Sequence, residues 1–135
     1  MKYQIKDIKP SATKVIDITQ YFTDPGEPVK LTIRHYSHYE ANEINALLLQ
    51  GQSFKRGADD EDEVSVKKFH MAEAFLARMK AGVVVEGEEF PFQSWTEEFI
   101  RELDRLNPDL TGFISDEIVG YNRPLRQKKG KKSSG

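Results

Sequence analysis

This sequence contains no cysteine, no long apolar run and no glycine-rich phosphate-binding motif. Without cysteine the chain cannot form disulfides, use a thiol nucleophile, or hold an iron–sulfur cluster or a cysteine-ligated zinc. A membrane-spanning helix needs about 20 apolar residues, and residues 1–10 lack the apolar segment of a secretory signal. We therefore expect a soluble, cytoplasmic protein, and its length of 135 residues suits a single domain.

Charge is unevenly distributed along the chain, although the formal net charge is only -2. Residues 123–135 carry six basic side chains and no acidic one, whereas residues 1–122 carry 14 basic and 22 acidic side chains, a net of -8. A segment with almost nothing apolar to bury is typical of disorder. We predict one folded domain over residues 1–122, followed by a disordered basic tail over residues 123–135.

Two short segments near the N-terminus have the pattern of β-strands. Residues 14–18 are rich in β-branched side chains, and apolar and polar side chains alternate over residues 29–34. The turn-forming residues 24–28 lie between these segments, so a β-hairpin is predicted. Tyr3 and Ile5 are candidates for a third strand. Because two strands alone are not stable, the apolar face of the hairpin must pack against helices.

Capping residues mark the start of the first predicted helix. Ser37 and Glu40 form a capping box before a helix over residues 38–50, and Gly51 is a natural end for it. A second helix is predicted over residues 62–81, because its apolar side chains fall on one face.

Two further helices follow in the C-terminal half. The segment Ser94–Glu97 is a second capping box and opens the third helix, while Asn107 as N-cap and Pro108 at the first position open the fourth, which Gly120 would close. The predicted fold class is therefore α+β: an N-terminal β-hairpin followed by about four amphipathic helices, mainly helical overall.

The sequence has no convincing catalytic or metal-binding pattern. His35, His38 and His70 could be imagined as metal ligands with an acidic residue, but a strand end followed by a helix start gives them no common face. The acidic run Asp59–Glu63 lacks the spacing of a calcium-binding loop and is better explained as a solvated helix start. We expect no enzyme activity, no metal and no cofactor.

Apolar residues between the second and third helices are the candidate partner-binding segment. They are Val83, Val84, Val85, Phe90, Phe92 and Trp95. The commonest role of such side chains is to build the core. Four amphipathic helices can also leave a groove open, and aromatics around Pro91 could anchor a peptide or a second copy in it.

The order of elements resembles that of the small tail assembly chaperones of long-tailed bacteriophages over essentially the whole chain. The resemblance rests on the hairpin with the sequence DPGEPVKL at residues 24–31, on WTEEF at 95–99, on NPDL at 107–110 and on the lysine-rich end. It implies a protein that binds the tape measure protein and keeps it soluble. It also implies that a longer product recruits tail tube subunits, with possible self-association into a ring or spiral.

The lysine-rich end is the most specific part of this resemblance. Many genes of the family produce the longer product by a -1 ribosomal frameshift near the end of the short reading frame, and slippage needs repeated bases. A-rich codons would encode the run Lys128, Lys129, Gly130, Lys131 and Lys132. The alternative function is a small regulatory or nucleic-acid-associated protein that acts through this tail, although the acidic body would repel a phosphate backbone.

Overall fold

The structure, a computed structural model, describes residues 1–53 and 60–123, with the backbone alone for residues 51–53 and 60–70. Its elements are β1 (Thr13–Asp17), β2 (Lys30–Arg34), α1 (His38–Ser53), α2 (Asp60–Gly82), α3 (Glu97–Leu106) and α4 (Pro108–Asn122), with short 3-10 helices at Ile5–Asp7 and Thr19–Tyr21. The predicted α+β class is confirmed, with a hairpin followed by four helices. The tail after Arg123, including the lysine-rich run, lies outside the described residues.

The hairpin turns one apolar face toward the helices. β1 and β2 pair antiparallel with Ile16 opposite Leu31. Ile16, Ile18, Leu31 and Ile33 are each at most 4% exposed. Because successive side chains of a strand point to opposite faces, the other face carries Val15, which is 56% exposed. The alternation in the sequence thus identifies the buried face correctly.

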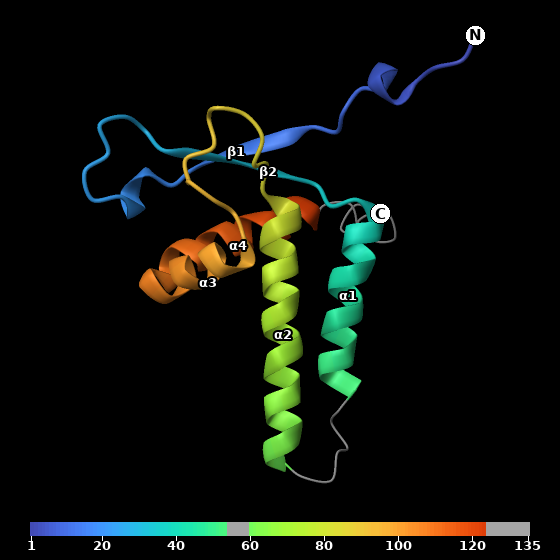
Figure 1. Cartoon of the computed structure of the whole chain (residues 1–135), viewed down its shortest axis with the longest axis vertical. Coiled ribbons are helices and arrows are strands. Elements are labelled where there is room, and N and C mark those ends of the chain that lie inside the picture. Colours follow the sequence, from blue (N-terminus) through green and yellow to red (C-terminus); the bar gives the residue numbers. More distant parts are fainter. Residues whose placement is uncertain (54–59, 124–135) are drawn as a thin grey trace, which may run out of the picture.

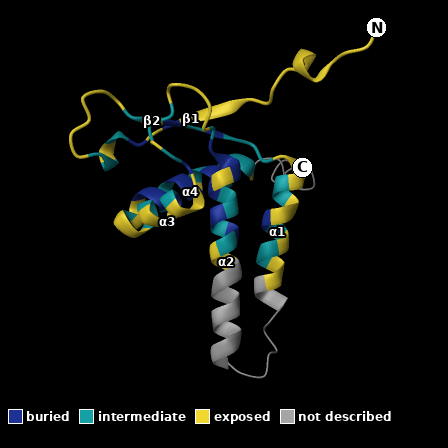
Figure 2. Ribbon diagram, in the orientation of Figure 1, coloured by how far each residue is buried: buried dark blue, intermediate teal, exposed yellow. Residues whose placement is uncertain are grey.

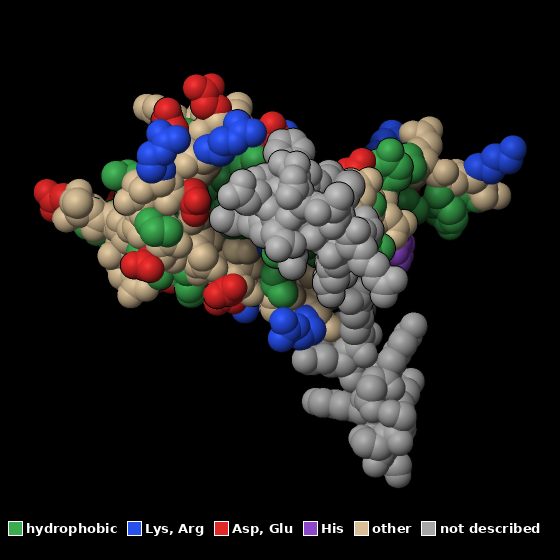
Figure 3. Space-filling view, turned by 90° about the horizontal axis from the view of Figure 1, so that it is seen from below, with side chains coloured by type: hydrophobic (Ala, Val, Ile, Leu, Met, Phe, Trp, Pro, Cys, Tyr) green, Lys and Arg blue, Asp and Glu red, His purple; other side chains and the backbone are tan. Residues whose placement is uncertain are grey.

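The helices form two pairs, α1 with α2 and α3 with α4, which meet at the C-terminal end of α2. α1 and α2 make an antiparallel helical hairpin that projects from the body, while α3 and α4 lie across the end of α2 nearest the strands (Figure 1). Buried residues concentrate where this end of α2 meets the strands and α4 (Figure 2). Acidic and basic side chains are interspersed over the surface of the α3 and α4 pair (Figure 3).

The predicted third strand is wrong. Within the described residues the sheet has two strands, and residues 1–12 extend away from the body (Figure 1). Tyr3 is 73% exposed and Ile5 is 89% exposed. These two side chains contact no apolar face, so nothing compensates the entropy of ordering them as a strand.

Two predicted helix starts are confirmed atom by atom. Ser37 Oγ accepts from the Glu40 backbone N–H at 3.0 Å, and Glu40 Oε1 accepts from the Ser37 N–H at 2.9 Å. Asn107 Oδ1 accepts from the Leu110 N–H at 3.2 Å, and Pro108 occupies the first helical position. Both caps satisfy backbone donors that have no partner inside the helix.

Three predicted helix boundaries are wrong. α1 continues past Gly51 to Ser53, and α4 continues past Gly120 to Asn122. A glycine inside a helix costs only about 1 kcal/mol relative to alanine, and beyond Gly120 the Asn122 side chain accepts from the Tyr36 N–H at 2.9 Å, which holds the last turn of α4 in place. The N-cap of α3 is Thr96 and not Ser94, because Thr96 Oγ1 accepts from the Phe99 N–H at 3.1 Å.

The valines after α2 attach that helix to the hairpin. Val83 forms an isolated antiparallel bridge with Ile33, and the Val84 N–H donates to the Thr32 carbonyl at 2.9 Å. The free edge of β2 thereby gains a backbone partner.

Candidate functional site

The structure places part of the predicted partner-binding segment in the core. Val83 is 3% exposed and Trp95 is 9% exposed. The indole N–H of Trp95 donates to the Met79 carbonyl at 2.9 Å, a buried hydrogen bond that ties the loop before α3 to α2. Because these two side chains are already covered by the protein itself, they offer little surface to a partner.

Phe92 lies at the centre of an aromatic cluster. Its ring stacks on Trp95 with centroids 5.3 Å apart and contacts Phe90 at 5.8 Å, Phe99 at 5.7 Å and Phe22 at 6.1 Å. Aromatic pairs at these distances add to the energy of burial. The cluster therefore joins the hairpin connection to the start of α3.

The remaining predicted residues differ in exposure. Phe90, Phe92 and Val84 are half-buried, and Val85 is 47% exposed. The structure thus brings the three aromatic residues of the segment together, leaves Val85 at the surface, and gives the segment a role in packing. A partner could reach only the outer edges of the two phenylalanines and Val85.

A pocket lies elsewhere, between the N-terminal half of α1, the C-terminal part of α2 and the end of α4. Its volume is about 480 Å³, within the range of about 300–1,000 Å³ that is usual for ligand pockets. It is lined by Tyr36, Ser37, His38, Ala41, Asn42, Ile44, Asn45, Leu48, Arg78, Val119, Asn122 and Arg123. Sequence analysis did not identify this site.

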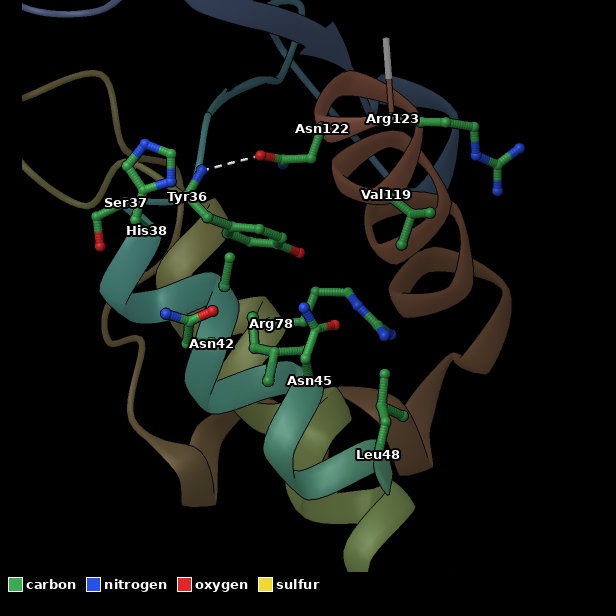
Figure 4. A pocket seen from close by; sticks show the side chains of 12 residues that line it. Tyr36, Ser37, His38, Asn42, Asn45, Leu48, Arg78, Val119, Asn122 and Arg123 are labelled. Carbon is green, nitrogen blue, oxygen red and sulfur yellow. Dashed lines mark hydrogen bonds between the residues drawn. The ribbon is translucent and has the colours of Figure 1, made fainter. Parts of the chain in front are cut away.

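Hydrogen bonds fix the upper wall of the pocket. The Tyr36 backbone N–H donates to Asn122 Oδ1 at 2.9 Å, and Asn122 Nδ2 donates to the Ile118 carbonyl at 2.9 Å (Figure 4). The segment between β2 and α1 is thereby held against the end of α4. This contact positions the Tyr36 side chain, which points from the strand end into the pocket (Figure 4).

The phenol of Tyr36 is unsatisfied. Its oxygen is buried, and although the Arg78 guanidinium lies beside it, no hydrogen bond of good geometry reaches it from the described residues. Burial raises the pKa of Tyr36 to about 12, and the positive charge of Arg78 opposes that shift only in part. The phenol therefore remains an O–H group across the physiological pH range, able to donate a hydrogen bond to a bound group.

Arg78 reaches the middle of the pocket, where its guanidinium lies between Leu48 and Val119 (Figure 4). It donates one long hydrogen bond, to Ser115 Oγ at 3.4 Å. In the described part of the chain no carboxylate pairs with it. The neighbouring acid, Glu40, is directed elsewhere: its Oε1 accepts from Arg34 at 3.1 Å and from the Ser37 N–H.

The pocket can bind a ligand through donors and apolar walls. None of its lining residues is acidic, so no carboxylate of the pocket competes with a ligand for the Arg78 donors. Among the side chains that the structure describes, no group of three or more His, Asp or Glu residues is placed to hold a metal ion. Among the helices described, none is long and apolar enough to cross a membrane.

Sequence reasoning missed the pocket because its residues come from three distant segments. The two ends lie in residues 36–48 and 119–123, and Arg78 comes from between them. The one local signal was an arginine inside an amphipathic helix, which is ordinarily explained by solvent exposure. No family model, curated protein or solved structure matches this chain.

Proposed function

We propose that this protein is a non-enzymatic tail assembly chaperone of a long-tailed bacteriophage, which binds and solubilises the tape measure protein. The observation that carries the proposal is the projecting α1–α2 hairpin with an open pocket between α1 and α4. A partner helix can lie along α1 and insert apolar side chains between the two helices. This geometry adds to the resemblance in element order along the sequence.

Apolar side chains on the helical hairpin support a protein partner. Tyr39 is 75% exposed, Leu49 is 64% exposed and Met71 is 50% exposed. Inside the pocket, Ile44 and Leu48 of α1 face Val119 of α4. A tape measure chain exposes apolar helical stripes before assembly, and covering these stripes prevents aggregation. The acidic charge of residues 1–122 would keep such a complex in solution.

Recruitment of tail tube subunits by a longer frameshifted product belongs to the same proposal, as do self-association and a location in the host cytoplasm. The gene sequence tests the frameshift directly. A slippery heptamer at the codons for residues 128–132, with an overlapping -1 reading frame, is the expected result. Codons without repeated bases at this place would contradict this part of the proposal.

Co-expression tests the chaperone function. The wild-type protein should raise the soluble fraction of a helical tape measure fragment and co-elute with it in size exclusion. Leu48→Glu puts a charge on the apolar wall of the pocket and should abolish both effects. Leu106→Glu is the matched control, because Leu106 is 83% exposed at the end of α3.

The outcome is interpreted only for variants whose circular dichroism and melting temperature match the wild type. If the fragment is equally insoluble with and without the protein, the proposed function is wrong. If both leucine variants retain the complex, the partner does not use the pocket.

A further inference from the structure

The pocket between α1, α2 and α4 contains hydrogen-bond donors that no acidic side chain of its lining satisfies. Arg78 carries five N–H donors in a planar, fork-shaped group; it makes a long hydrogen bond to Ser115 and lies beside the Tyr36 phenol, which leaves further donors for a ligand. The Tyr36 hydroxyl is buried, and no acceptor for its proton lies within hydrogen-bond geometry among the described residues. The Asn45 side chain lies beside Arg78 (Figure 4). Because buried donors are normally satisfied, the Tyr36 hydroxyl fits an acceptor supplied by a ligand, and the half-buried Arg78 guanidinium can reach the same acceptor.

The acceptor that best matches these donors carries a negative charge. A guanidinium binds a carboxylate through two parallel hydrogen bonds, and such charge-assisted bonds are roughly twice as strong as neutral ones. No acidic side chain lines the pocket, and Glu40 is bonded to Arg34 and Ser37. The positive charge of Arg78 is therefore not neutralised from within the described structure.

The walls of the pocket favour a carboxylate on an apolar carrier over a free phosphate or a nucleic acid. Ile44, Leu48 and Val119 line the space around Arg78. Arg123 lies at the rim, but its side chain points away from the pocket (Figure 4), so a single guanidinium serves the ligand. One cation suits a singly charged group, and the net charge of -8 over residues 1–122 repels multivalent anions.

We infer that the pocket binds the carboxylate of an Asp or Glu side chain on an amphipathic helix. Arg78 holds the carboxylate through its fork, the Tyr36 hydroxyl donates a further hydrogen bond, and the apolar residues beside the acid pack on Leu48 and Val119. The inference rests on the proposed function in one respect, since the helix is taken to belong to the bound partner. The site thereby selects partner helices that carry an acid within their apolar face.

A titration with small molecules tests the site without any partner protein. The probes are 4-methylpentanoate, its neutral amide 4-methylpentanamide, and inorganic phosphate, each in the millimolar range at constant ionic strength. Chemical shifts of the Arg78 side chain and of the Asn42 and Asn45 side-chain amides report on the pocket. The carboxylate should shift these signals with saturation, and the amide and phosphate should bind about tenfold more weakly or not at all.

Three variants assign the effect to the pocket. Arg78→Gln should weaken carboxylate binding about tenfold or more, because a charge-assisted pair is lost. Arg78→Lys should retain part of the affinity, since lysine keeps the positive charge but cannot make two parallel hydrogen bonds to the carboxylate. Arg101→Gln removes an exposed arginine from α3 and should leave binding unchanged. A dispersed amide spectrum verifies the fold of each variant.

Each other result overturns the inference. Equal shifts by the amide would show that charge is not recognised, and equal or stronger shifts by phosphate would exclude selection of a carboxylate. Shifts that persist in Arg78→Gln would place the ligand elsewhere, and the absence of shifts would remove the site. None of these results involves a tape measure fragment, so they are distinguishable from a failure of the proposed chaperone function.

Discussion

Adding one methyl group at Gly82 should destabilise the protein. Gly82 is the last residue of α2, and a Cβ atom built on it would lie 2.5, 2.9 and 3.0 Å from three side-chain carbons of Ile118 on α4. Favourable contacts between carbons occur at about 3.5–4.0 Å. Ile118 is fully buried, so it has no free space into which to move.

The magnitude follows from two opposing effects of Gly82→Ala. Overpacking a core costs about 1–3 kcal/mol, while replacing a helical glycine by alanine contributes up to about 1 kcal/mol. The net loss is about 1–2 kcal/mol in the free energy of unfolding. Urea denaturation followed by circular dichroism measures this difference, and a fall in Tm of about 4 °C per kcal/mol should accompany it.

The control is Gly112→Ala, inside α4. A Cβ at Gly112 meets nothing within 4 Å, so this variant should be more stable than the wild type by about 0.5–1 kcal/mol. In an Ile118→Ala background the crowding atoms are absent, and Gly82→Ala should no longer destabilise. The reasoning is refuted if Gly82→Ala alone is as stable as the wild type, or if its cost persists beside Ala at position 118.

Three further predictions concern the caps and polar groups described above. Trp95→Phe should lower the free energy of unfolding by about 1–3 kcal/mol, because the Met79 carbonyl loses its buried donor; an unchanged urea midpoint would contradict this. Thr96→Ala should cost about 1 kcal/mol and Ser94→Ala almost nothing, since Thr96 is the N-cap; the reverse order in thermal denaturation would restore the cap at Ser94. Burial raises the pKa of Tyr36 to about 12 from its ordinary value of 10.0. Ionisation of this phenol in the unfolded chain therefore lowers the free energy of unfolding as the pH rises from 10 toward 12, and has no effect below pH 10. Urea midpoints between pH 9 and 12 should therefore fall more for the wild type than for Tyr36→Phe, and parallel curves would show that the phenol is not shifted.

Sequence patterns with a local cause were good guides to the fold. The alternation over residues 29–34 identified the buried face of β2, and the side chains of Ser37 and Asn107 marked two helix starts. These features depend on neighbours three or fewer positions away, so they can be recognised without knowing the fold. The tail over residues 124–135 lies outside the described structure, and its disorder stays a prediction.

The sequence predictions failed where the local pattern allows more than one outcome. Gly51 and Gly120 were taken as helix ends, but both helices continue through them. Ser94 has the same capping chemistry as Thr96, and the choice between them follows from the burial of Trp95 against α2.

The sequence by itself determined the hairpin, the succession of four helices, the absence of thiol chemistry and the separation of an acidic body from a basic tail. These properties depend on composition and on short-range periodicity. Only the tertiary structure decided that Trp95 belongs to the core and that Arg78 enters a pocket with Tyr36 and Leu48. Side chains become buried, and donors become desolvated, only when segments far apart in the chain pack together. A local sequence pattern does not predict which of these segments come into contact.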